Sequence, residues 1–154
     1  LGVKPERNLF LSINYDGNFE ESQGWAALGA TASVQGRMRR YVESQPAFAQ
    51  ASLAQAVELA LCSWAVGSLA QAASESPAAE SSSTQLSEEQ TEGDGSSLPD
   101  KAALLAHVRQ TVAEKSLECV LLERRGPGSA KYRALRPEEL GRLLPSAVSA
   151  PATT

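Results

Sequence analysis

The chain has little of several residue types, and each shortage excludes a class of protein. Its 154 residues contain two cysteines, which are too few for a disulfide scaffold. One histidine and no clustered cysteines exclude a zinc site of ordinary ligand spacing. Aromatic residues make up only 5% of the chain, but hydrophobic residues make up 42%, close to the globular average. A folded chain of this length buries roughly 70% of its unfolded surface, so one core is expected.

The chain also lacks an excess of basic charge. Its 14 basic and 18 acidic residues give a net charge of -4, which argues against a basic nucleic-acid binder. Six of the acidic residues lie between Ser74 and Ser97, with eight serines and no lysine or arginine. Such a segment cannot bury enough surface to offset the entropy of ordering it, so residues 73–98 are predicted to be a disordered acidic insert.

No apolar run reaches the length of a membrane span. The longest, Leu59–Ser74, has 16 residues, whereas a span needs about 20. We therefore expect a soluble helix there, no membrane partner and a cytoplasmic location. The first residues are interrupted by charge and do not form a signal peptide, and Leu1 in place of methionine suggests a fragment or a processed chain. The polar residues that interrupt the run are Ser63, Ser68 and Gln71.

The first part of the chain, residues 1–72, reads as strands followed by helices. Asn8–Tyr15 alternates apolar and polar residues, and Asp16-Gly17 predicts a two-residue type I′ hairpin turn into a return strand over residues 18–22. Trp25–Leu28 is expected to be a short strand covered on both faces. Two helices follow. Residues 32–44 have an apolar stripe of Val34, Met38, Tyr41 and Val42. The second helix starts with a Ser52/Gln55 capping box, runs to about residue 70 or 71, and has a stripe of Leu53, Val57, Ala60, Leu61 and Trp64.

After the insert, residues 99–145 predict a helix, a hairpin and a closing helix. Pro99 begins a helix to about Lys115, with Leu104, Leu105, Val108 and Val112 on its apolar side. Strands are expected at 116–124 and 130–135 around a turn at 125–128. A short helix from Pro137 to Leu144 carries two acidic residues in its first turn, which suits the helix dipole. Residues 146–154 are predicted to be a flexible tail.

Candidate catalytic residues do not group into a site, so no catalytic, cofactor-binding or metal-binding residue is predicted. His107 is interpreted as a structural or solvated helix residue, and Cys62 and Cys119 as small buried thiols. Gly29 through Ser33 precedes a helix and could hold an anion there, but capping by Thr31 or Ser33 is the better interpretation. Five arginines are interpreted as solvated surface residues: Arg37, Arg39, Arg40, Arg124 and Arg125. The side chains of Glu20 and Glu21, and those of Glu138 and Glu139, are expected to point in different directions as chain neighbours, so neither pair forms a general acid/base pair.

The order of several short motifs resembles the proteasome subunit family, most closely the bacterial, actinobacterial-type α subunit. The resemblance starts with LFLSINYDGN at residues 9–18, which is similar to the family's strand and Tyr-Asp-Gly hairpin. Next come Trp25–Ala30, Arg37–Ser44 and SLAQAVELALCSWA at residues 52–65. It closes with LECVLLER at 117–124 and Arg133–Leu144. The resemblance covers about residues 1–72 and 116–144. The insert and the extra helix, about 74–115, depart from the family pattern.

The resemblance implies an α+β fold that is the C-terminal half of a four-layer αββα sandwich, the N-terminal-nucleophile hydrolase type, with the N-terminal half missing. It implies a non-catalytic α-type ring subunit that gates substrate entry and has no cofactor. Its partners would be other α subunits, β subunits and a ring ATPase activator. The family's catalytic threonine, gating residues and activator-docking pocket all lie in the absent half, so none is assigned. Two alternatives stay open: a catalytic β-type threonine peptidase subunit, and a non-enzymatic interaction module with an acidic arm.

Overall fold

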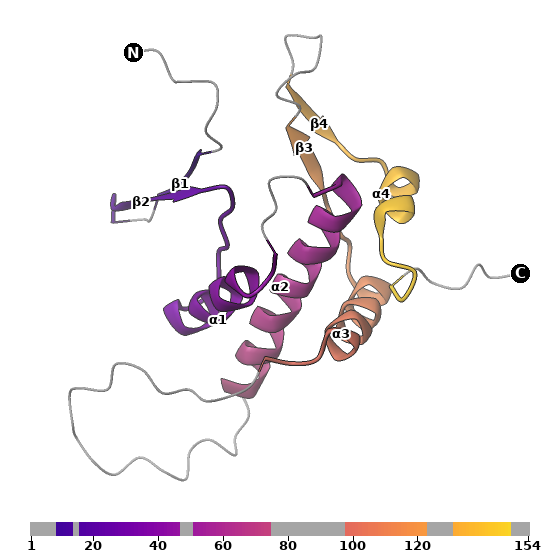
Figure 1. The fold of residues 1–154 in the computed structure, drawn as a ribbon, viewed down its shortest axis with the longest axis horizontal. Coiled ribbons are helices and arrows are strands. Elements are labelled where there is room, and N and C mark those ends of the chain that lie inside the picture. The colour runs from indigo at the N-terminus through magenta and orange to yellow at the C-terminus, as the bar shows by residue number, and fades with distance from the viewer. Residues whose placement is uncertain (1–8, 14–15, 47–50, 75–97, 123–130, 149–154) are drawn as a thin grey trace, which may run out of the picture. The chain divides into compact units, whose positions relative to one another are not determined.

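The computed structural model describes residues 9–13, 16–46, 51–74, 98–122 and 131–148, and it has the expected α+β class (Figure 1). Most of the acidic insert, the Arg124–Arg125 pair and the end of the predicted tail lie outside these residues. The elements in chain order are β1 (Leu9–Ile13), β2 (Phe19–Gln23), α1 (Ala32–Glu43), α2 (Leu53–Ser74), α3 (Lys101–Glu114), β3 (Val120–Leu122), β4 (Tyr132–Ala134) and α4 (Pro137–Leu143).

The chain divides into two compact units. Unit 1 consists of residues 1–50 and 66–98, and unit 2 consists of residues 51–65 and 99–154. Helix α2 therefore contributes its first part to unit 2 and its last part to unit 1. The two sheets are separate two-stranded antiparallel hairpins, β1–β2 in unit 1 and β3–β4 in unit 2.

The hairpin of unit 1 forms where it was predicted, but its register differs from the prediction. Ile13 pairs with Phe19, so five residues connect the strands. A two-residue turn at Asp16-Gly17 would have paired Ile13 with Glu20, and that prediction is wrong. The cause is local chemistry: the Asp16 carboxylate accepts from the Asn18 backbone at 3.1 Å and from its side-chain amide at 2.7 Å, while Gly17 has φ +84°. The turn thus closes on Asn18 and keeps it out of the ladder.

The predicted strand at Trp25–Leu28 is absent, since these residues form an irregular connection. Gly24, with φ +83°, turns the chain away from β2, so the apolar run has no ladder to join. Gly29 then packs against the start of α1, where an added Cβ would lie 2.6 Å from the Gln35 backbone nitrogen. Thr31 is the N-cap, as expected: its Oγ1 accepts from the Val34 N–H at 3.2 Å.

Helix α1 buries the apolar stripe that its spacing predicted: Val34, Met38, Tyr41 and Val42. Part of this packing is against the end of α2 that belongs to unit 1. The approach is close at Gly67, where a Cβ would lie 2.7 Å from the Met38 sulfur. The Arg39 guanidinium also pairs with the Glu20 carboxylate of β2, so α1 and the hairpin are joined by an ion pair.

In unit 2, α2 starts with the predicted capping box. The Ser52 N–H donates to Gln55 Oε1 at 2.8 Å, and the Gln55 N–H donates to Ser52 Oγ at 3.3 Å. The predicted stripe is buried only in part. Val57 and Leu61 are buried, whereas Leu53, Ala60 and Trp64 are exposed. The full-stripe prediction is therefore wrong: the stripe lines an open pocket rather than a closed core.

Helix α3 begins at Lys101, two residues later than predicted, with Asp100 as its N-cap. The Asp100 carboxylate accepts from the Ala102 N–H at 3.3 Å. Three of the four expected core residues, Leu104, Leu105 and Val108, are buried, and Val112 is partly exposed at the pocket.

The first strand of the second hairpin begins later than predicted. Residues 116–119 are irregular, and the described residues pair Val120 with Ala134, Leu121 with Arg133 and Leu122 with Tyr132. Residues 123–124 and 130 of the predicted strands lie outside the described residues. Helix α4 starts at Pro137 as expected, and the Arg136 N–H donates to the Glu139 carboxylate at 3.1 Å. Residues 146–148 form a turn in which Val148 is buried, while residues 149–154 of the predicted tail lie outside the described residues.

Among the described residues, α2 is the one helix long and apolar enough to cross a membrane. The sequence argument against a span counted 16 residues, but the helix has 22 because it begins at Leu53. The argument from length is therefore wrong. The core helix of a soluble protein meets the same criteria, so length and composition do not separate the two cases.

Candidate functional site

The β1–β2 hairpin presents an apolar face to solvent. The observed register places Leu9, Leu11, Ile13 and Phe19 on one side of the two strands. All four are exposed, from 43% for Leu9 to 74% for Ile13. A two-residue turn would have put Phe19 on the opposite side, so the observed register adds Phe19 to the face of Leu9, Leu11 and Ile13. Phe10, which pairs with Ser22, is exposed on the other face.

The β3–β4 hairpin of unit 2 also presents an apolar face to solvent. Leu122 lies opposite Tyr132 in the ladder, and Val120 shares their face. Leu122 is 71% exposed and Tyr132 is 63% exposed. An isolated two-stranded sheet is marginally stable in water, and apolar side chains of this size are usually covered when a sheet is complete. Each hairpin therefore offers an uncovered apolar surface.

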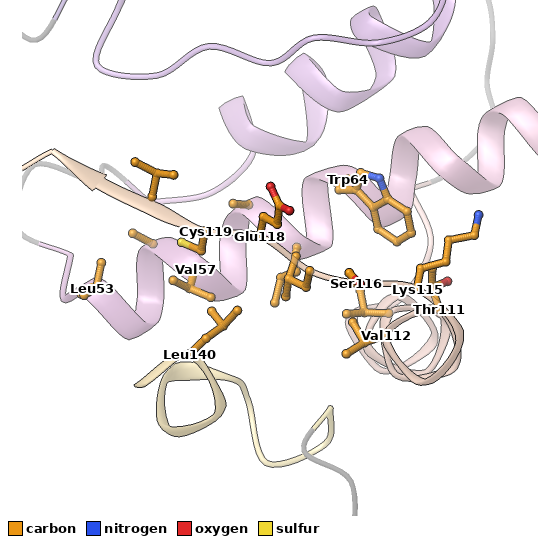
Figure 2. Close-up of a pocket in the computed structure, with 16 residues that line it drawn as sticks. Leu53, Val57, Trp64, Thr111, Val112, Lys115, Ser116, Glu118, Cys119 and Leu140 are labelled. Atoms are coloured by element: carbon orange, nitrogen blue, oxygen red, sulfur yellow. The ribbon is translucent and has the colours of Figure 1, made fainter. Parts of the chain in front are cut away.

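Unit 2 also contains a pocket of about 660 Å³ between α2, α3, the segment after α3 and α4 (Figure 2). One wall is the exposed part of the α2 stripe, including Leu53, Ala60 and Trp64. Val108, Val112 and Leu140 complete most of the apolar lining. This volume lies within the usual range of pockets that bind small molecules, about 300–1,000 Å³.

The polar side chains of the pocket are not spread evenly. Figure 2 shows Thr111, Lys115 and Ser116 together near the C-terminal end of α3, while Leu53, Val57 and Leu140 lie at the other end. The Thr111 hydroxyl donates to the His107 carbonyl at 3.0 Å. Lys115 and Ser116 are both exposed to solvent at this end of the pocket, and neither the Lys115 ammonium nor the Ser116 hydroxyl has a hydrogen-bond or ion-pair partner among the described residues. The pocket is therefore apolar at one end and carries unpaired hydrogen-bond donors at the other.

His107 does not face a candidate nucleophile. Its ring stacks on the Trp64 indole, with 5.7 Å between ring centroids and 17° between planes. This contact joins α2 to α3 beside the pocket and agrees with the structural interpretation of His107. The stacking was not predicted, because the sequence shows only that both residues lie on helices.

The two cysteines differ in exposure. Cys62 is 1% exposed, as predicted, but Cys119 is only partly buried and lines the pocket. The prediction of two buried thiols is therefore wrong for Cys119. The segment after α3 is irregular where an apolar strand was expected, so it leaves this thiol at the pocket wall.

Ion pairs between charged side chains join elements within the two units. Beside Arg39–Glu20 in unit 1, unit 2 has Lys101–Glu58 between α3 and α2, and Arg133–Glu139 between β4 and α4. The hydrogen bond and charge of Glu58 raise the pKa of Lys101. The Arg136 N–H, and then the Arg133 guanidinium, lower the pKa of Glu139. These partners give the charged residues structural roles.

The part of the chain that the structure describes holds no group of three or more potential metal ligands. Thr31 is committed to capping α1, and Glu20 and Glu21 point to opposite faces of β2. The candidate site that sequence reasoning missed is the pocket. Its signal was present in the long apolar side of α2, but that side was assigned to the core.

Comparison of the chain with protein-family models, with curated proteins and with solved structures gives no match.

Proposed function

We propose that the chain is part of a non-catalytic α-type subunit of a proteasome core particle and acts through its contacts with neighbouring strands and subunits. The observation that supports this most directly is the pair of hairpins, each with one uncovered apolar face. In a sandwich of two stacked sheets, such faces pack on each other across about 10 Å.

The order of elements supports the same proposal. A hairpin, two helices, a second hairpin and a closing helix follow one another, as in the motifs that resemble the family. Helix α3 is an addition to that order. On this proposal the missing cover of β1–β2 and β3–β4 comes from adjacent subunits of the ring.

The decisive experiment is native size fractionation of cells that express the tagged full-length gene product. We expect the chain to migrate with a high-mass particle that contains proteasome subunits and cleaves a fluorogenic peptide. The purified chain alone is expected to give no cleavage, because a threonine peptidase needs a free N-terminal nucleophile whose own amine acts as base. Migration at low mass without other proteasome subunits would overturn the proposal.

A matched pair of variants tests the role of the hairpin face. Ile13→Lys places a charge on the exposed face of β1 and is expected to remove the chain from the particle. Ala73→Lys adds the same charge at an exposed position of α2 and should leave assembly unchanged. Peptide cleavage by the isolated chain would instead favour the β-type alternative.

A further inference from the structure

We propose that the pocket of unit 2 binds a small amphipathic carboxylate, with its apolar body along α2 and its carboxylate at Lys115 and Ser116. This inference does not depend on the ring-subunit proposal, since it uses only residues of unit 2.

The apolar end of the pocket sets the chemistry of the ligand's body. The pocket-lining residues of α2 recur at helical spacing from Leu53 to Trp64. At 1.5 Å per residue this wall is about 16 Å long. A wall of that length, facing Val108, Val112 and Leu140, fits an extended alkyl chain or a narrow aromatic body. Burial of such a ligand would remove apolar surface of both partners from water.

The polar end selects the head group. Lys115 supplies an ammonium with three donors, and Ser116 supplies a hydroxyl. Both lie beside Thr111, whose hydroxyl already donates to His107 and so offers only its lone pairs. Two unpaired donors, one of them cationic, match a carboxylate better than a neutral or cationic head.

The acidic residue of the pocket does not cancel this preference. Figure 2 shows the Glu118 carboxylate and the Lys115 ammonium on opposite sides of Trp64. A ligand carboxylate at Lys115 is thereby kept apart from Glu118, whereas a ligand with anionic groups at both ends would meet repulsion. The pocket thus favours a single carboxylate on an apolar body.

The test compares dodecanoate with dodecanol, two probes that differ in the head group, both kept below the concentration at which they form micelles. In a Trp25→Phe background, Trp64 is the remaining tryptophan and its fluorescence reports occupancy of the pocket. The second readout is the rate at which iodoacetamide alkylates Cys119, measured by mass spectrometry, with the buried Cys62 as an internal control. Dodecanoate is expected to shift the Trp64 emission and to slow alkylation of Cys119.

Two variants separate the head-group site from the apolar site. Lys115→Gln should weaken dodecanoate binding about tenfold and leave dodecanol binding unchanged, since it removes one charge-assisted contact. Its control is Lys131→Gln, which removes a lysine that does not line the pocket. Ala60→Phe fills the pocket from its exposed wall and should abolish binding of both probes, while Ala54→Phe on the same helix should not.

The proposal fails on any of three results. The first is that dodecanoate binds no more tightly than dodecanol. The second is that Lys115→Gln leaves both affinities unchanged. The third is that Ala60→Phe binds both probes as the parent chain does. Circular dichroism of each variant verifies that it is folded. If Ala60→Phe does not fold, the same binding measurements on the smaller Ala60→Leu variant and on Lys115→Gln test the proposal.

Discussion

The same substitution, glycine to alanine, should stabilise the chain in α1 but not in α2. Alanine is favoured over glycine inside a helix by about 1 kcal/mol. At Gly36 in α1 an added Cβ has no heavy atom within 4 Å, so the full gain is available. We expect Gly36→Ala to stabilise the chain by about 1 kcal/mol, which raises Tm by about 2–4 °C for a chain of this size.

At Gly67 the methyl group would meet other atoms. An added Cβ lies 2.7 Å from the Met38 sulfur, 2.9 Å from Met38 Cγ and 3.3 Å from Val34 Cγ1. Overpacking of this kind costs about 1–3 kcal/mol. The Met38 side chain is flexible, so the clash costs about 1–2 kcal/mol, the lower part of that range. Set against the helix gain of about 1 kcal/mol, Gly67→Ala should be neutral or destabilise by up to about 1 kcal/mol.

A third variant tests the cause. Met38→Ala removes the two nearest atoms, so Gly67→Ala introduced in that background should stabilise rather than destabilise, and the coupling between the two sites measures the clash. The assay is thermal and urea unfolding followed by circular dichroism. If Gly67→Ala stabilises the parent chain as much as Gly36→Ala does, the close approach of α1 and α2 is refuted.

Three further predictions use the same unfolding assays. Ser63→Ala should stabilise by about 1 kcal/mol, because the Ser63 hydroxyl is buried and has no hydrogen-bond partner among the described residues; a loss of stability would show that the hydroxyl has a partner. Leu104→Ala should destabilise by about 2–5 kcal/mol, since Leu104 is 0% exposed, whereas Leu122→Ala at a 71% exposed position should cost far less; similar costs would contradict the assigned core. The pKa of Glu139 is lowered in the folded chain, so its contribution to stability is present above its ordinary pKa of 4.5 and is lost as pH falls through the lower folded value. Glu139→Gln should therefore flatten that part of the curve of unfolding free energy against pH. An unchanged curve would exclude this role of Glu139.

Sequence patterns predicted the helices better than the strands. Helix α1 and its four buried residues, the Ser52 capping box and the Pro137 start of α4 all followed from periodicity and capping chemistry. These signals are local, since a helix satisfies its backbone within its own turn. The strand at Trp25–Leu28 failed because a strand needs a neighbour, and the chain turns away at Gly24.

The pocket was beyond prediction for a related reason. The apolar side of α2 was visible in the sequence, but periodicity does not tell a face that is packed from one that borders an opening. Leu53, Ala60 and Trp64 belong to the same stripe as Val57 and Leu61, yet only the last two are buried. All five side chains line the pocket, whose other walls include residues 116–119.

Helix α2 has a consequence for how the chain folds. Residues 53–65 belong to one unit and residues 66–74 to the other, within a single helix. Neither part exceeds the length of about 12–15 residues below which an isolated helix is marginal in water. Loss of either unit would therefore leave a short helical stub that frays, which removes packing from the unit that remains. The shared helix makes the two units dependent on each other for stability, so that proteolysis or mutation in one should expose the backbone of both.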